Sequence, residues 1–132
     1  MPAIYIGCSL TQAPPEFVAA VTDLKLQLKD TFEIMDFVGL TDGTPADVYR
    51  WDIERCVAGC DLFVAICDYP AIGLGYELGV AIEKLDKPVL ALAQTGNRIS
   101  RLLEGIPSAR YALRRYGNFS EIPDLIKQAI PD

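Results

Sequence analysis

The chain has 132 residues, of which 51% are hydrophobic, and a formal net charge of -6. These totals favour one globular domain over residues 1–132 and exclude a largely disordered chain. The acidic balance, which includes no basic block, argues against nucleic acid or an anionic membrane as a partner. No apolar run approaches the roughly 20 residues of a membrane span, and no basic region precedes the first apolar stretch, so we expect a cytoplasmic protein.

Cysteine and histidine usage narrows the possible chemistry. The chain has four cysteines and no histidine, which excludes a Ser-His-Asp triad, a Cys-His pair and a histidine-bound metal. Cys56 and Cys60 are four residues apart, a helical spacing, and no second pair has metal-type spacing. We therefore expect reduced core thiols, no metal and no organic cofactor. Acid–base or nucleophilic chemistry must then come mainly from carboxylates.

The first half of the chain alternates between strand and helix patterns. An apolar run predicts a strand at Ala3–Cys8, and Pro14-Pro15 opens a helix whose apolar residues repeat at helical spacing. A second strand is expected around residues 33–38, followed by a polar loop at 41–45 and a helix at about 46–59. The buried stripe of that helix is predicted to comprise Tyr49, Ile53, Cys56, Val57 and Cys60.

The second half continues the alternation. Residues 61–67 are predicted to form a strand that is apolar throughout after Asp61, the pattern of a strand buried on both faces. Further strands are predicted near residues 89–93 and 110–115, with helices after residue 75, near 99–104 and near 121–129. This order predicts an α/β fold, a flavodoxin-like three-layer sandwich with a five-stranded parallel sheet in the order 2-1-3-4-5. Ligands bind such sheets beyond the carboxyl ends of strands one and three, where Ser9, Asp68 and the turn at 73–77 fall.

Glu77 is the first candidate for chemistry, because it follows an apolar strand and two glycines. The helix that contains it is predicted to bury Leu78, Ala81, Ile82 and Leu85, with Glu77 at the edge of this stripe in the first turn. Free backbone amides and the helix dipole at that position favour an ionised carboxylate. Such a group suits a nucleophile or a stabiliser of positive charge, although an ordinary first-turn glutamate that improves the helix has the same pattern.

The two glycines before Glu77 also allow two interpretations. Gly73 and Gly75 could cradle a phosphate with their backbone amides, or they could allow close packing. Their spacing does not fit the dinucleotide fingerprint, and the Walker lysine is absent, so a dinucleotide or ATP site is not expected.

Two further residues could act together with Glu77. Asp52 flanks the buried stripe of the helix at 46–59, so it is either a functional acid or a solvated neighbour of the core. Tyr5 lies inside the first strand. Its hydroxyl is either satisfied within the core or donates a hydrogen bond to a carboxylate in the pocket.

Six segments spread over nearly the whole chain share a known pattern. They are residues 5–9 (YIGCS), 48–53 (VYRWDI), 60–65 (CDLFVA), 73–79 (GLGYELG), 87–90 (KPVL) and 98–105 (RISRLLEG). Together they resemble the nucleoside 2-deoxyribosyltransferase family, and most closely its branch of 2'-deoxynucleoside 5'-monophosphate N-glycosidases. The Gly-x-Gly-x-Glu-Leu-Gly turn, combined with an upstream aspartate and an N-terminal tyrosine, makes the pattern specific.

The resemblance implies catalytic roles for three residues. The glutamate that matches Glu77 attacks C1' of the deoxyribose and displaces the base, which leaves a glycosyl-enzyme ester. An oxocarbenium-like transition state is stabilised by a carboxylate against the anomeric carbon, in agreement with this role. Tyr5 would orient that carboxylate, and Asp52 would handle the leaving base and the incoming water or base.

The resemblance also implies a binding site that two subunits share. Ser9 and Leu10 would line the sugar-base pocket. The amides of Gly73 and Gly75 would approach the 5' end of the sugar, together with Ser100 from the neighbouring subunit of a homodimer or higher homo-oligomer.

Three positions depart from the pattern of one branch or the other. Ala71 stands where the hydrolases carry serine and the transferases aspartate, and Thr11 stands where the hydrolases tend to carry arginine. Ser100, in place of the asparagine of the transferases, favours hydrolysis. Asp68 could substitute for a missing polar contact.

The expected function is therefore hydrolysis of the N-glycosidic bond of a small-molecule 2'-deoxynucleoside 5'-monophosphate through a deoxyribosyl-glutamate intermediate. One alternative is a nucleoside 2-deoxyribosyltransferase, in which a second free base takes the place of water. The other is a non-catalytic nucleotide-binding module on the same fold, which predicts binding without release of the base.

Overall fold

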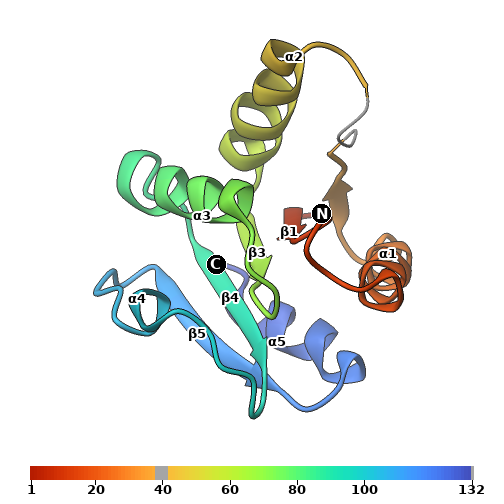
Figure 1. Cartoon of the computed structure of the whole chain (residues 1–132), viewed down its shortest axis with the longest axis vertical. Helices are drawn as coiled ribbons and strands as arrows, with labels where there is room; N and C mark the ends of the chain where they lie inside the picture. Colours follow the sequence, from red (N-terminus) through yellow and green to blue (C-terminus); the bar gives the residue numbers. More distant parts are fainter. Residues whose placement is uncertain (38–41, 132) are drawn as a thin grey trace.

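A computed structural model describes residues 1–37 and 42–131 and contains one five-stranded parallel sheet (Figure 1). The strands are β1 (Ala3–Cys8), β2 (Glu33–Met35), β3 (Leu62–Ile66), β4 (Val89–Gln94) and β5 (Tyr111–Tyr116). Their order in the sheet is β2-β1-β3-β4-β5, and Tyr5 of β1 pairs with Phe63 of β3. The predicted α/β class, parallel sheet and strand order are confirmed.

Helices connect these strands and cover both faces of the sheet (Figure 1). They are α1 (Pro15–Leu28), α2 (Pro45–Tyr49) with its π-helical continuation η1 (Arg50–Val57), α3 (Ile72–Gly79) with its π-helical continuation η2 (Val80–Lys84), α4 (Arg101–Glu104), the 3-10 turn η3 (Phe119–Glu121) and α5 (Ile122–Ala129). No helix among the described residues combines the length and the apolar character that crossing a membrane requires.

Alternate residues of the strands supply two separate cores. On one face, Ile4 and Ile6 of β1 pack with α1 and α5. On the other, Tyr5 of β1 and Phe63 of β3 pack with η1, α3 and η2. Because side chains in a strand point alternately to opposite faces, a run that is apolar throughout can fill both cores. Tyr5 therefore faces the layer of helices that contains Asp52 and Glu77.

Two predicted boundaries or faces differ from the structure. β2 ends at Met35, three residues before the predicted end at position 38. Position 38 lies outside the described residues, and so does position 41, the first residue of the predicted loop at 41–45. Tyr49 was predicted to be buried, but it is 41% exposed. Backbone bonds of the wider i→i+5 type begin just after it, so the residue four positions before Ile53 no longer lies above Ile53.

The four cysteines are free thiols. Burial raises the pKa of Cys56 to about 12, that of Cys60 to about 11 and that of Cys67 to about 12. Such thiols remain protonated near neutral pH, and a thiol is a poor nucleophile compared with a thiolate. These three side chains therefore act as small apolar groups of the core.

Candidate active site

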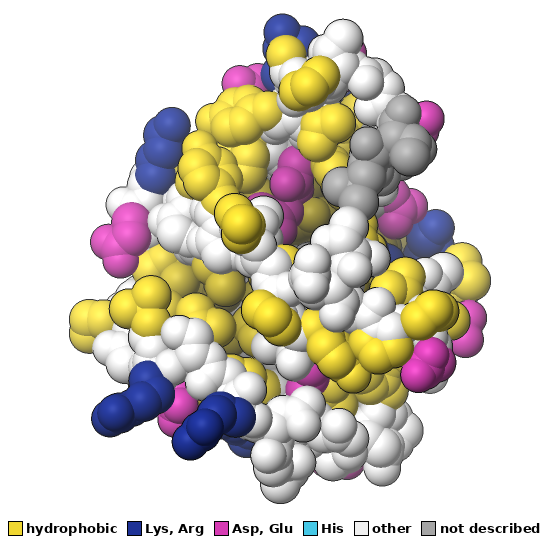
Figure 2. Space-filling model, in the orientation of Figure 1, with side chains coloured by type: hydrophobic (Ala, Val, Ile, Leu, Met, Phe, Trp, Pro, Cys, Tyr) yellow, Lys and Arg dark blue, Asp and Glu magenta, His cyan; other side chains and the backbone are white. Residues whose placement is uncertain are grey.

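A cavity of about 740 Å³ opens beyond the carboxyl ends of β1 and β3. Its walls come from the loop after β1, from the helix formed by α2 and η1, and from the first turn of α3. Figure 2 shows this hollow near the middle of the face, with acidic side chains at its floor and hydrophobic side chains around it. The polar groups at the floor are those of Tyr5, Asp52 and Glu77.

One hydroxyl group joins the two carboxyl groups. The Tyr5 Oη lies 2.7 Å from Oε2 of Glu77 and 2.8 Å from Oδ1 of Asp52. Asp52 is 47 residues from Tyr5 along the chain, and Glu77 is 72 residues from it. The fold therefore brings together the three residues that were predicted to carry the chemistry.

Glu77 lies deeper than the sequence indicated. It is 5% exposed and shares the buried side of its helix with Leu74, Leu78 and Ala81. α3 begins at Ile72, so Glu77 occupies the second turn rather than the first, away from the free amides of the helix start. Burial, reinforced by the neighbouring Asp52 carboxyl, raises the pKa of Glu77 to about 9. This shift is opposite in direction to the one expected from a position in the first helical turn, and it favours the protonated form of Glu77 near neutral pH in the free protein.

A glycine in β1 makes room for the Glu77 carboxyl. A Cβ atom built on Gly7 would lie 3.0 Å from Phe63, 3.1 Å from Leu74 and 3.2 Å from Oε1 of Glu77. Contacts this close would displace the carboxyl or its neighbours. Sequence reasoning assigned no role to Gly7, although an isolated glycine inside a strand is a known signal of close approach.

The Tyr5 ring is held by the core beneath it. It is 3% exposed and stacks on Phe63 of the neighbouring strand, with ring centroids 5.4 Å apart and planes inclined by 19°. This packing fixes the ring independently of its hydroxyl group. Removing the hydroxyl alone should therefore leave the ring in place.

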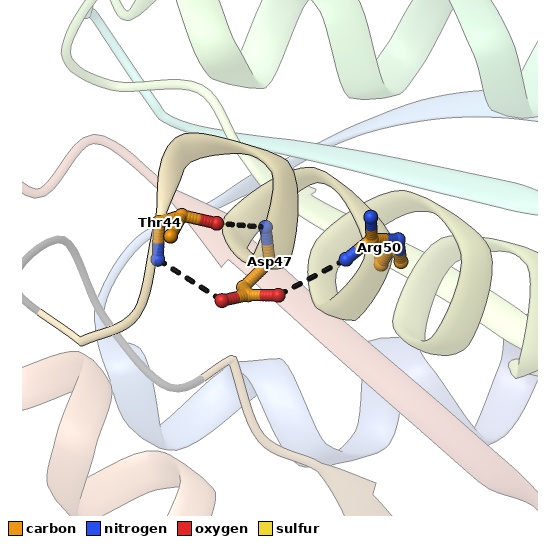
Figure 3. A network of polar contacts seen from close by, with 3 residues as sticks. All are labelled: Thr44, Asp47 and Arg50. Atoms are coloured by element: carbon orange, nitrogen blue, oxygen red, sulfur yellow. Dashed lines mark hydrogen bonds and ion pairs between the residues drawn. The ribbon is translucent and has the colours of Figure 1, made fainter.

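Asp52 is positioned by the start of its helix. Figure 3 shows the capping box that opens α2: the Asp47 amide donates to the Thr44 hydroxyl at 3.2 Å, and the Thr44 amide donates to the Asp47 carboxylate at 3.1 Å. Arg50 adds an ion pair to the same carboxylate at 3.0 Å. The box satisfies amides that a helix start otherwise leaves unpaired, so it fixes the chain direction into η1.

A second contact holds this helix against the sheet. The Trp51 indole donates to the carbonyl oxygen of Asp36, just after β2, at 2.6 Å. The Arg55 guanidinium lies over the Trp51 ring, 4.2 Å from its centroid. Asp52 follows Trp51 directly, so these contacts orient the turn that directs its carboxyl toward Tyr5.

The other predicted residues divide between two places. Leu10 and Gly73 line the main cavity, whereas Gly75, Asp68 and Ser100 line a separate cavity of about 350 Å³ between α3 and α4. Ser9 is fully buried, and its hydroxyl accepts a hydrogen bond from the Gln12 amide at 3.1 Å. Ser9 therefore shapes the loop after β1 rather than facing the cavity, which corrects its predicted place in the wall.

Asp68 is engaged within the protein. One of its carboxylate oxygens accepts from the Gln94 amide at 2.7 Å and from the Asn97 side chain at 2.8 Å. The other accepts from the Tyr116 hydroxyl. These bonds tie the end of β3 to the loop after β4 and to β5. A substrate contact by Asp68 stays a prediction, and any such contact would share the carboxylate with these donors.

Gly73 and Gly75 lie inside α3 rather than in a turn before it. A Cβ on either would meet nothing within 4 Å, so neither glycine is required by packing within the chain. A helical glycine costs about 0.5–1 kcal/mol relative to alanine. The open space beside them is therefore available to a ligand or to a second subunit.

The ionisable residues described in the cavity wall are all acidic. Among the described residues that line it, the only charged types are Asp52 and Glu77, and none is lysine or arginine. Phe37 and Val48 add apolar wall that sequence reasoning did not assign to the site, because no local pattern marks them. No group of three metal-ligating side chains occurs within residues 1–37 and 42–131.

Comparisons with known proteins found one similar sequence and similar folds. No protein-family model matches the sequence. A protein of Thermofilum pendens, provisionally named 2'-deoxynucleoside 5'-phosphate N-hydrolase 1, is 30% identical over 90 residues, which are 67% of this chain and 62% of that protein. The match thus spans less than two thirds of the relative.

Two solved structures share the fold. The CMP N-glycosidase of Clostridium botulinum superposes with a TM-score of 0.75, covering 96% of this chain and 98% of that one, at 18% identity. The 2-desoxiribosyltransferase of Leishmania mexicana gives a TM-score of 0.67, covering 97% and 98%, at 14% identity. The resemblance to the nucleoside 2-deoxyribosyltransferase family is confirmed. The catalytic roles of the three residues on the cavity floor stay a prediction.

Proposed function

We propose that this protein is a cytoplasmic enzyme that hydrolyses the N-glycosidic bond of 2'-deoxynucleoside 5'-monophosphates and releases the free base. The observation that carries the proposal is the pair of carboxyl groups joined by the Tyr5 hydroxyl at the floor of one cavity. The volume of about 740 Å³ falls within the usual range of small-ligand sites, roughly 300–1,000 Å³. The name of the Thermofilum relative and the two structural neighbours support the same class of reaction.

The separation of the carboxyl groups supports a double displacement. The Glu77 and Asp52 oxygens that contact the Tyr5 hydroxyl lie 2.7 and 2.8 Å from it, so these two oxygens are no farther apart than the sum of these distances. Glycosidases that retain configuration hold their carboxyl groups about 5–5.5 Å apart, whereas inverting enzymes need roughly 6.5–9.5 Å to admit a water molecule. The geometry therefore favours a covalent intermediate.

In the proposed reaction, an oxygen of ionised Glu77 forms a bond to C1' as the bond from C1' to the base nitrogen breaks. Asp52 donates a proton to the departing base, so the base leaves neutral. Water then attacks C1' of the glycosyl ester, and Asp52 takes its proton back from that water. Glu77 is released as a carboxylate. The proton that Asp52 donates to the base in the first step is replaced by a proton from water in the second step.

A transferase is the second candidate, and the charge of the cavity favours it. No described residue of the wall is a cation that could pair with a phosphate, and Ala71 lines the wall without a hydroxyl. A free base in place of water would then resolve the intermediate. One observation favours a phosphate instead: Ala71 precedes α3 without a side-chain cap, so the first amides of this helix are available to an anion.

A matched pair of substrates tests the need for a phosphate. We expect a deoxynucleoside 5'-monophosphate to be preferred over its nucleoside in kcat/KM, but by less than in enzymes that carry both the serine and the arginine missing here. Each lost hydrogen bond to a charged group costs about ten- to hundredfold in specificity. Base release from both compounds, measured by chromatography for each of the four bases, gives this ratio. A second free base in the same mixture detects transfer. If the nucleoside is preferred and bases are exchanged, the protein is a transferase and not a hydrolase. If the compounds bind but no base is released, the protein is a non-catalytic binding module.

We also propose that two subunits complete the site. Ile72 is 96% exposed beside the main cavity and Leu102 is 77% exposed beside the second one, where Ser100 also lies. Ser100 caps α4 by accepting from the Leu102 amide at 3.3 Å. Exposed apolar side chains of this size at the rim of a site favour contact with a second copy.

Sedimentation velocity tests the assembly. We expect a dimer at assay concentration, and Leu102→Asp should shift the protein to monomer and lower base release together. Leu26→Asp, which places the same charge at a residue 58% exposed on α1, serves as the matched control and should remain dimeric. A parent protein that is monomeric and active would exclude a shared site.

A further inference from the structure

Three oxygen atoms meet at the floor of the cavity, one each from Tyr5, Asp52 and Glu77, and their contacts require one proton more than Tyr5 supplies. A phenol carries a single hydrogen, and Tyr5 can donate it to only one of the two carboxyl groups at a time. Both contacts are nevertheless short, 2.7 Å to Glu77 and 2.8 Å to Asp52. An ionised carboxylate cannot donate, so two short contacts require that one of the carboxyl groups be protonated and donate to the Tyr5 oxygen.

Burial decides which carboxyl group holds this proton. Glu77 is 5% exposed, whereas Asp52 is half-buried at the wall of the cavity. Desolvation disfavours the charged form of the more deeply buried group. In the free protein, the Glu77 carboxyl therefore donates to the Tyr5 oxygen, and the Tyr5 hydroxyl donates to the Asp52 carboxylate.

The reaction needs the opposite arrangement. Glu77 must be ionised to attack C1', and Asp52 must be protonated to release the base. We propose that Tyr5 relays one proton from Glu77 to Asp52 as substrate binds, which converts the resting pair into the reactive pair. This inference rests on the proposed function.

The relay is balanced without a co-reactant. The O–H bond of Glu77 breaks and its proton bonds to the Tyr5 oxygen, while the original O–H bond of Tyr5 breaks and its proton bonds to Asp52. Tyr5 ends as a neutral phenol, and the charge of -1 moves from Asp52 to Glu77. Burial, followed by the charges of Glu77 and Asp52, raises the pKa of Tyr5 far above its usual range, so a lasting phenolate is disfavoured at every stage.

Substrate binding supplies the reason for the transfer. A sugar placed over Glu77 develops positive charge at C1', which stabilises a carboxylate there. The proton that Glu77 then loses passes through Tyr5 to Asp52, the other carboxyl group that contacts this hydroxyl. Other titratable groups near the pair are Lys25 of α1, which lowers the pKa of Glu77, and the thiols of Cys8 of β1 and Cys56 of η1. Burial raises the pKa of both thiols, so neither competes as an acceptor of this proton.

The test compares two leaving groups in the variant Tyr5→Phe. Phenylalanine keeps the ring that stacks on Phe63 and removes only the hydroxyl. One substrate is the natural deoxynucleotide, whose base must be protonated as it leaves. The other is 4-nitrophenyl 2-deoxyriboside, whose phenolate leaves without a proton. Both substrates need the ionised Glu77, which the variant can still reach by losing the Glu77 proton to solvent. Only the natural substrate also needs a proton on Asp52, so the ratio of the two kcat/KM values isolates delivery of the proton to Asp52.

We expect Tyr5→Phe to lower kcat/KM for the natural substrate about 100-fold more than for the nitrophenyl compound, as loss of a general acid does. Asp52→Asn should change the ratio in the same direction. Tyr49→Phe removes the hydroxyl of a half-exposed tyrosine outside the three-oxygen chain and should leave the ratio unchanged. If Tyr5→Phe slows both substrates equally, Tyr5 only positions Glu77 and the relay is overturned.

The resting proton can be detected without turnover. Infrared spectra of the free protein at pH 7 should show the carbonyl stretch of a buried carboxylic acid, which Glu77→Gln abolishes and Tyr5→Phe shifts. Absence of this band in the parent contradicts the relay whatever the activity. Failure of the proposed function is recognised separately, by full activity of Glu77→Gln on both substrates or by a parent that releases no base while the band is present.

Discussion

Glu77→Gln is expected to reduce base release by at least about 10³-fold while the fold is retained. The amide has nearly the same shape as the protonated carboxyl that the free protein contains, so the contact with Tyr5 can persist. An amide, however, cannot form the glycosyl ester. Base release and far-ultraviolet circular dichroism measured on the same samples check both parts, and Glu83→Gln, an exposed glutamate on the same helical segment, is the control.

The same substitution should stabilise the protein at high pH. The pKa of Glu77 is raised by folding to about 9, so the folded protein binds a proton that the unfolded chain releases above the ordinary glutamate value. Stability that is present below that value is therefore lost as pH rises toward 9. Glutamine does not titrate. We expect the Tm of Glu77→Gln to exceed that of the parent by more than about 3 °C at pH 9, with a smaller difference at pH 5.

These two results separate the role of the residue from its environment. Loss of activity without the gain in Tm would place Glu77 in the mechanism but contradict its protonation in the free protein. Full activity of Glu77→Gln would remove Glu77 from the mechanism, whatever its effect on stability.

Asp52→Asn has the second largest expected effect, a loss of about 10²–10⁴-fold in base release from nucleotides, which is the usual contribution of a general acid. The shape of the pH profile should change as well. In the parent, kcat/KM is expected to fall as pH rises through about 9, because the site then loses the single proton that the leaving base needs.

In Asp52→Asn this descending limb should disappear. Removing the Asp52 charge also removes one cause of the raised Glu77 pKa, so the residual activity should rise with pH and level off below 9. Profiles of kcat/KM from pH 5 to 10 test this, with Glu54→Gln, an exposed acid two residues away, as the control. A parent profile that stays flat through pH 10 would contradict a shared proton.

Patterns of apolar residues along the chain were sufficient to predict the architecture. Continuous apolar runs such as residues 62–67 indicated strands buried on both faces. The helices between the strands required parallel pairing, and all four strand pairs of the sheet are parallel. The physical reason is local: the spacing of apolar residues along one element records which of its sides faces the core. The same patterns, with their motifs, selected Tyr5, Asp52 and Glu77 as candidates.

Periodicity failed where a side chain depends on its neighbours from other elements. It placed Tyr49 in the core, because a change in helical hydrogen bonding within the segment leaves no mark in residue spacing. The position after the first strand and the family resemblance placed Ser9 in the cavity wall, whereas a turn to Gln12 buries that hydroxyl. Periodicity assigned nothing to Gly7, whose missing side chain makes space for the Glu77 carboxyl.

The electrostatic environment of the site depends on contacts between elements that are far apart in the sequence. Three residues separated by 47 and 72 positions meet at one hydroxyl oxygen because β1, η1 and α3 pack against each other. The depth of Glu77 in that packing sets its desolvation, and the nearness of Asp52 adds a second charge to the same site. Both quantities depend on distances between elements, which no pattern along the chain contains. The raised pKa of Glu77 therefore depends on the assembled core.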